Sequence, residues 1–197
     1  AAEALGAIGG PQAVPALIKA LGDSDRGVRC AACAALGAIG GAQAVPALTK
    51  ALGDSDRGVR CAACAALGAI GDPQAVPALI EALGKGEAED SYFLLVLLGG
   101  SWESVYDFRR AAAEALVKIG TPAVPALIQA LGDRDWDVHR AAAWALGAIG
   151  DPQAVPVLSV WVHAGDNAAR YALQALGHPA LDLPQAVAQV AAQGAWG

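Results

Sequence analysis

The sequence predicts an all-α solenoid, a row of stacked two-helix repeats that forms a single domain over residues 1–197. Three observations lead to this fold class. One segment recurs every 31 residues, from Ala13 to Ala44 to Ala75; proline and glycine divide each copy into two helical stretches; and aromatic residues make up only 5% of the chain. A core with so few large side chains packs best when alanine-rich helices approach one another closely in a regular stack.

The repeat is nearly exact in the first half of the chain, where residues 13–43 recur as 44–74. The same opening, A-V-P, returns at Ala123 and at Ala154, again 31 residues apart, and more loosely at Ala186. Self-similarity at a fixed period is typical of stacked-repeat architectures. The intervals predict about five helix pairs, with half-repeats at both ends.

Each unit is expected to contain two helices. The first spans Ala13–Gly22, with Pro15 in its first turn, where the missing N–H costs nothing, and a glycine at its end. The turn Asp23–Asp25 offers side-chain oxygens as N-caps for the second helix, expected at Val28–Gly40. Helices this short are marginal alone, so neighbouring pairs must cover each other's apolar faces.

The second helix is expected to be two-sided. At 100° per residue, one face forms the core and carries Val28, Ala32, Ala35, Leu36 and Ile39. The opposite face carries Cys30, Cys33, Ala34 and Gly37. At the ends of the row we expect half-repeats at Ala1–Gly9 and at about Leu183–Gln193. The chain opens at Ala1 inside an expected helix, and the sequence leaves open whether it is a fragment of a longer protein.

The pattern A-V-P-A-L-I-x-A-L-x-D-x-D-x-x-V-R-x-A-A-x-x-A-L-G-x-I-G resembles the HEAT-like repeats of the phycobilisome-lyase class. It is also similar to artificial repeat proteins built from that consensus. The resemblance covers nearly the whole chain apart from one insertion. It implies a right-handed superhelix whose second helices line the concave face. It also implies a bilin (chromophore) lyase or isomerase as one possible activity.

The third repeat is interrupted by an insertion at about residues 84–104. It contains an apolar run, and periodicity alone does not decide whether that run is a helix or a strand. Its aromatic residues Tyr92, Phe93 and Trp102 are candidate partner-binding residues. One interpretation is that the insertion packs onto its own solenoid; the other is that it contacts a partner or a second copy of the chain. Ser101 is the expected N-cap of a second helix that runs to Ile119.

The expected concave face changes character along the chain. In the first two repeats it offers small residues, whereas in the later repeats it offers arginine and aromatic side chains, the types enriched at binding hot spots. The candidate partner-binding residues on this face are Arg110, Glu114, Trp136, Arg140, Trp144, Tyr171 and Gln174. We therefore expect a protein- or peptide-binding scaffold, with Trp136 at the edge of the groove.

Composition excludes several other classes of function. A net charge of −6 suits a nucleic-acid backbone poorly, and no stretch has the length of a membrane span. The N-terminus has no signal-peptide pattern, and four cysteines in such a chain are typical of reduced thiols. These features favour a cytoplasmic protein with neither a nucleic-acid nor a membrane partner.

Two C-x-x-C pairs, Cys30/Cys33 and Cys61/Cys64, are the one constellation that suggests metal, and a four-cysteine zinc site is an alternative interpretation. No nucleotide-loop, zinc-protease or catalytic-triad motif is present, so we expect no enzyme and no cofactor. A spacing that recurs in the repeats predicts structural ion pairs rather than binding residues. The arginines Arg29, Arg60 and Arg109 recur at one repeat position, and Asp25 and Asp56 precede two of them at ion-pair spacing.

Overall fold

The computed structural model describes residues 10–85 and 108–193, and all of their regular structure is helical. The α-helices are α2 (Val14–Ala20), α3 (Arg26–Ile39), α4 (Val45–Ala51), α5 (Arg57–Ile70), α6 (Val76–Gly84), α8 (Phe108–Ile119), α9 (Val124–Ala130), α10 (Trp136–Ile149), α11 (Val155–His163), α12 (Asn167–Leu176) and α13 (Leu183–Gln193). Short 3-10 helices precede the first helix of each repeat, at Pro11–Ala13, Ala42–Ala44, Pro73–Ala75, Thr121–Ala123 and Pro152–Ala154.

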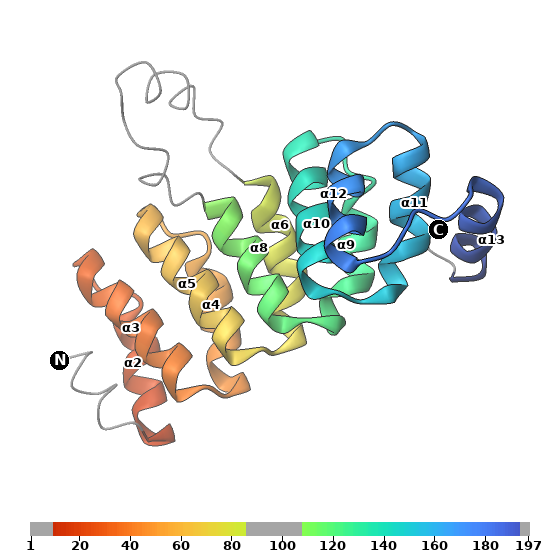
Figure 1. Cartoon of the computed structure of the whole chain (residues 1–197). Helices are drawn as coiled ribbons and strands as arrows, with labels where there is room; N and C mark the ends of the chain where they lie inside the picture. Colours follow the sequence, from red (N-terminus) through yellow and green to blue (C-terminus); the bar gives the residue numbers. More distant parts are fainter. Residues whose placement is uncertain (1–9, 86–107, 194–197) are drawn as a thin grey trace, which may run out of the picture.

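The helix pairs stack in one row from α2/α3 to α11/α12, and α13 follows at the end (Figure 1). The second helices α3, α5, α8, α10 and α12 pack directly against one another along the row. From α2 to α11 the first helices touch one another far less, and only the last of them, α11, packs closely on α13. Because the second helices are the more closely spaced layer, they form the inner side of the stack. The predicted all-α solenoid is confirmed.

The helix ends follow the predicted signals with small shifts. Pro15 lies in the first turn of α2, although α2 itself starts only after the 3-10 turn Pro11–Ala13. The second helix α3 begins at Arg26, two residues earlier than expected, because Asp25 is its N-cap. The Asp25 carboxylate accepts a hydrogen bond of 2.7 Å from the backbone N–H of Gly27. The trailing helix α13 has the expected bounds.

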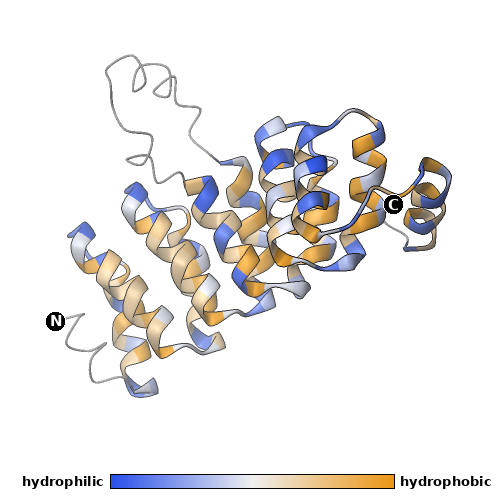
Figure 2. Cartoon of the chain, viewed as in Figure 1, coloured by the Kyte–Doolittle hydropathy of each residue, from blue (hydrophilic) through white to orange (hydrophobic). Residues whose placement is uncertain are grey.

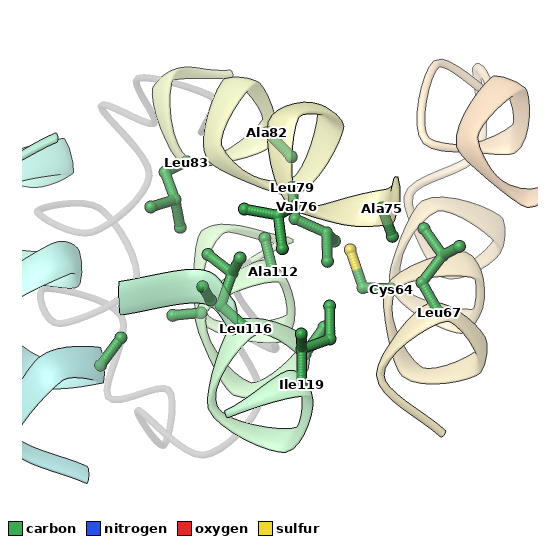
Figure 3. Close-up of a cluster of buried hydrophobic side chains, with 14 of the residues drawn as sticks. Cys64, Leu67, Ala75, Val76, Leu79, Ala82, Leu83, Ala112, Leu116 and Ile119 are labelled. Carbon is green, nitrogen blue, oxygen red and sulfur yellow. The ribbon is translucent and has the colours of Figure 1, made fainter. Parts of the chain in front are cut away.

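The core is a continuous double row of leucines between the two layers. Fully buried leucines recur once per repeat on the first helices (Leu17, Leu48, Leu79, Leu127, Leu158) and on the second (Leu36, Leu67, Leu116, Leu146). Figure 2 shows the apolar side of each helix turned toward its neighbours, and Figure 3 shows Leu79 of α6 and Leu116 of α8 meeting in this core. Each such side chain contributes about 1.5–3 kcal/mol by leaving water.

More residues of the second helix are buried than the predicted core face contains. Ala32, Ala35 and Leu36 are buried as expected, but Cys33 is also fully buried, as is Cys64. The prediction that Cys33 lies on the face opposite the core is therefore wrong. The reason is that α3 contacts the next second helix, α5, as well as its own first helix, so the buried sector covers more of its circumference than one stripe.

Glycine permits this close approach of the second helices. A Cβ atom built on Gly37 of α3 would lie 2.8 Å from the Cα atom of Ala66 in α5. Gly147 of α10 meets Ala172 of α12 in the same way, at 2.9 Å. These distances are shorter than real Cβ contacts, so at these positions only glycine lets the two backbones pack this closely.

Arg29 links the first repeat to the second, but it binds a different aspartate from the expected Asp25. The Arg29 guanidinium binds Asp54 of the next repeat with two hydrogen bonds of 2.9 Å, rather than Asp25 of its own repeat. Its Nη1 also donates to the carbonyl oxygen of Asp23. For Arg29 the i,i+4 prediction was wrong, because the Asp25 carboxylate caps the helix and accepts from its backbone.

Several predictions concern residues outside the described ranges: the leading half-repeat, the insertion with its apolar run, and the Ser101 cap. The end of the third second-helix at Ile119 is confirmed. Among the described residues, no single helix is long and apolar enough to cross a membrane. The pair Phe108–Ile119 and Thr121–Ala130 reaches that length and composition only when joined across a bend of 118°.

Candidate functional site

An open groove of about 1150 Å³ lies over the inner side of the stack, between α8, α10 and α12. Its lining comes from these three second helices: Arg109, Arg110, Ala113, Asp137, Arg140, Ala141, Trp144, Gly147, Ala148, Ala168, Tyr171, Ala172 and Ala175. The groove therefore lies in the later repeats, where the sequence departs from its small-residue pattern.

The repeat geometry aligns the large side chains of the groove. Arg110 of α8 and Arg140 of α10 occupy the repeat position that Cys30 and Cys61 hold earlier in the chain. Their side chains are 67% and 63% exposed. Trp144 follows Arg140 by one helical turn, which places both on one face of α10.

Two aromatic side chains stand in the groove without being buried by the fold. Trp144 of α10 is 49% exposed and Tyr171 of α12 is 71% exposed, and both line the groove. Aromatic rings that remain exposed to water are available to a partner. Covering them removes a large apolar area from water, which favours binding. They supply the apolar part of the site.

The floor of the groove is made of small residues. Ala113 lies on α8, Gly147 and Ala148 on α10, and Ala172 and Ala175 on α12. The Gly147–Ala172 contact draws α10 and α12 together beneath the groove and leaves no side chain to fill it. The groove is thus open because of the same small residues that let the helices stack.

Cationic groups outnumber carboxylates in the lining. Nη1 of Arg109 lies 2.7 Å from Oδ2 of Asp137, while Nη1 of Arg140 reaches Oδ1 of the same aspartate only at 3.9 Å. Nε of Arg110 donates to Glu114 at 2.8 Å. Three arginines and one aspartate line the groove, so its local charge is positive although the whole chain is acidic.

The structure brings four of the predicted binding residues together in this groove: Arg110, Arg140, Trp144 and Tyr171. Glu114 lies beside it, paired with Arg110. Gln174 is exposed on α12 but is not part of the lining. The candidates Tyr92, Phe93 and Trp102 lie outside the described residues. The use of any of these residues by a partner remains a prediction.

Trp136 also lies outside the groove lining, at the start of α10. Its ring stacks on the imidazole of His139, with ring centres 4.9 Å apart and an angle of 9° between the planes. The ring of Trp161 in α11 meets the same imidazole in a T-shaped contact, with ring centres 4.7 Å apart. In the described structure Trp136 therefore covers a buried histidine, while its exposed face remains open to solvent.

Sequence reasoning missed His139 and Asp166, which form a buried pair between α10 and the N-terminus of α12. Nε2 of His139 lies 2.6 Å from Oδ2 of Asp166, and the two side chains are 2% and 3% exposed. A signal was present: His139 takes the repeat position of Arg29, and Asp166 is the N-cap of the next second helix, where its Oδ1 accepts from Ala169 N–H.

The four cysteines do not form a metal site. Within residues 10–85 and 108–193, no three His, Cys, Asp or Glu side chains gather closely enough to hold a metal ion. Burial raises the pKa of the Cys33 thiol to about 12, and burial likewise raises that of Cys64. The geometry gives the four-cysteine alternative no support, because the described cysteines do not converge on one point.

Comparison with known proteins gives one curated relative and several solved structures. Phycocyanobilin lyase subunit alpha from Picosynechococcus sp. is 41% identical over 80 residues, which are 40% of this chain and 29% of that protein. The match thus spans less than a third of the relative's length. The complex of CpcE and CpcF of phycocyanin lyase from Nostoc sp. is 24% identical, with 97% of this chain and 86% of that chain covered and a TM-score of 0.44.

A designed armadillo repeat protein in complex with the peptide (KR)4 is 19% identical, with 89% of this chain and 91% of that chain covered and a TM-score of 0.46. The family model for HEAT repeats matches residues 1–56, 28–91 and 103–191. These matches together span most of the sequence. The chain belongs to the HEAT repeat family.

Proposed function

We propose that this chain is a protein-binding scaffold that holds a segment of a partner in the groove between α8, α10 and α12. The observation that carries the proposal is the pair of exposed rings, Trp144 and Tyr171, flanked by arginines over a floor of alanine and glycine. Aromatic and arginine side chains dominate binding energy at protein interfaces. A groove of this volume and openness suits a peptide segment laid across several helices.

The described residues offer better support for binding than for catalysis. The groove lining contains no serine, cysteine or histidine, and its one carboxylate, Asp137, is held by Arg109 at 2.7 Å. The buried imidazole of His139 is held between the Leu131 carbonyl and Asp166, away from solvent. That the chain is not an enzyme nevertheless stays a prediction, since its curated relative is a lyase subunit.

A crosslinking experiment tests the binding role. Tyr171 is replaced by the photo-crosslinking amino acid p-benzoylphenylalanine, and Gln129, exposed on the first-helix side in α9, is replaced in a matched control. Both proteins are irradiated in a cell extract, and the attached protein is identified by mass spectrometry. The purified partner is then titrated against the unmodified chain and against Trp144→Ala.

The proposal predicts a partner attached from position 171 and not from 129, with affinity at least about tenfold weaker for Trp144→Ala. A partner that attaches equally from both positions, or that binds Trp144→Ala unchanged, would contradict it.

The second candidate function is that of a bilin lyase subunit, favoured by the 41% identity to phycocyanobilin lyase subunit alpha. The groove would accept such a pigment through its aromatic rings, while its arginines would meet the pigment's carboxylates. Mixing the chain with phycocyanobilin tests this candidate directly. A shifted absorbance spectrum that is lost in Trp144→Ala supports it, and an unchanged spectrum rejects it.

A further inference from the structure

Within the proposed binding role, on which the inference rests, we infer that the partner segment is acidic, with carboxylates that meet Arg110 and Arg140 and an apolar side chain that covers Trp144 and Tyr171. The occupant is thus a protein segment of aspartate or glutamate combined with large apolar residues. A basic or uncharged segment would not match the groove.

Charge is the first argument for an acidic segment. Three arginines and one aspartate line the groove, whereas the whole chain carries a net charge of −6. The lining therefore has an excess of positive groups, whereas the whole chain has an excess of carboxylates. Local complementarity of this kind orients a partner and rejects segments of the wrong sign.

The arginines are also available for new partners. Arg110 pairs with Glu114 across one turn of α8, and both side chains are largely in water. Arg140 lies 3.9 Å from Asp137, a carboxylate that Arg109 already holds at 2.7 Å. Ion pairs between exposed side chains contribute little to stability, so a partner's carboxylates can replace or join them at small cost. Arginine binds a carboxylate through two parallel hydrogen bonds, which adds direction to the contact.

Repeat geometry gives the spacing of the carboxylates. Arg110 and Arg140 occupy the same repeat position on adjacent second helices, and the axes of packed helices lie about 8–10 Å apart. An extended segment that crosses α8 and α10 advances about 3.3 Å per residue. Acidic residues two positions apart lie about 6.6 Å apart on the same side of an extended segment, within reach of the two long arginine side chains.

The aromatic rings fix the other end of the segment. Trp144 lies one turn beyond Arg140 on α10, and Tyr171 lies on the next second helix, α12. A chain that passes Arg110 and Arg140 reaches these rings next. An apolar residue after the acidic pair would cover them, and the alanine and glycine floor leaves room for it.

Selection from a random peptide library displayed on phage tests the inference. The full chain is the bait, and each enriched peptide is synthesised with a fluorescent label and titrated against four proteins by anisotropy. These are the unmodified chain, Trp144→Ala, the double variant Arg110→Glu/Arg140→Glu, and Lys19→Glu. Lys19 is exposed on α2, far along the row, and serves as the matched charge reversal.

We expect peptides rich in aspartate and glutamate that bind at least about tenfold more weakly to Trp144→Ala and to the double variant, but equally to Lys19→Glu. The same peptides with lysine in place of each acidic residue should bind the double variant more tightly than the unmodified chain. This gain cannot arise from an unfolded variant.

The outcomes separate the two proposals. Peptides that depend on Trp144 but are not enriched in acidic residues would leave the binding role in place and overturn the acidic partner. Acidic peptides that bind Lys19→Glu as weakly as the double variant would also overturn it, because their attraction would be to the whole surface. A library with no peptide that depends on Trp144 would overturn both.

Discussion

Nε2 of His139 lies 2.6 Å from Oδ2 of Asp166, and Nδ1 of the same ring lies 2.6 Å from the carbonyl oxygen of Leu131. Arg29, at the same repeat position, likewise joins its own repeat to the next, through the Asp23 carbonyl and the Asp54 carboxylate. One position in each of these repeats therefore carries a side chain that links neighbouring units. In the fourth repeat a buried imidazole performs this task.

Removing the imidazole should destabilise the chain strongly. His139→Ala leaves the Asp166 carboxylate buried without its partner, and breaking a buried pair on one side costs about 3–5 kcal/mol. Urea unfolding followed by circular dichroism measures the change. Arg134→Ala, at an exposed position in the turn before α10, is the control and should change stability by less than about 0.5 kcal/mol. Equal effects of the two changes would show that the pair does not hold the repeats together.

Trp144→Ala should separate binding from stability. The ring is 49% exposed and stands over the groove, so its loss should lower the free energy of unfolding by less than about 1 kcal/mol. Partner binding should weaken by about 2 kcal/mol, the loss typical of a hot-spot tryptophan. Thermal unfolding and a binding titration measure the two quantities. A much lower melting temperature for the variant would instead show that Trp144 is needed for the stability of the fold.

The glycine contacts predict opposite results for two alanine substitutions. In Gly37→Ala the new Cβ would meet the Ala66 backbone at 2.8 Å, and the forced separation of α3 and α5 should cost about 1–2 kcal/mol after the gain in helix propensity. In Gly22→Ala the nearest atom is the Lys19 carbonyl oxygen at 3.6 Å, an ordinary contact, so stability should stay equal or rise slightly. Chemical unfolding of both variants tests the contrast, which an equal loss would refute.

Alkylation should distinguish the two cysteine positions of the repeat. Burial raises the pKa of Cys33 to about 12, so at pH 8 almost no thiolate is present, and the side chain is inaccessible as well. Cys30 is only partly buried. With iodoacetamide and the folded chain, peptide mass spectrometry should find Cys30 modified well before Cys33 and Cys64. Simultaneous modification of all three would contradict the packing of α3 against α5.

Acid should weaken the link between the first two repeats. Hydrogen bonds from Arg29 hold the pKa of Asp54 below its ordinary value. A carboxyl group with a lowered pKa contributes stability above its unfolded pKa of about 3.9, and that contribution fades as the pH falls further. Asp54→Asn should thus be less stable than the unmodified chain at pH 7, with a smaller difference at pH 3. A difference that does not change with pH would contradict the ion pair.

Most of the fold could be predicted because the 31-residue repeat is visible in the sequence itself. The period, Pro15 in the first turn, the Asp25 cap and the trailing helix at Leu183–Gln193 all follow from local rules. The burial of Cys33 did not follow, because it depends on contact with a neighbouring repeat rather than on the helix's own periodicity. The Arg29–Asp54 pair was not predicted for the same reason, because its two residues belong to different repeats.

The candidate site was predictable only in part. Arg110, Arg140, Trp144 and Tyr171 were found as departures from the repeat, and the stacking of α8, α10 and α12 brings them together. The groove itself could not be deduced, because its depth depends on how closely Gly147 lets α10 approach α12. The role of His139 required knowing that Asp166 faces it across the same interface.

We propose that the groove between α8, α10 and α12 is the binding face. The most direct measurement is the affinity of the partner attached from position 171 for the unmodified chain and for the double variant Trp144→Ala/Tyr171→Ala, both checked for an unchanged melting temperature. Removing the two exposed rings should weaken binding by more than about tenfold. An affinity equal to that of the unmodified chain would show that the partner binds elsewhere.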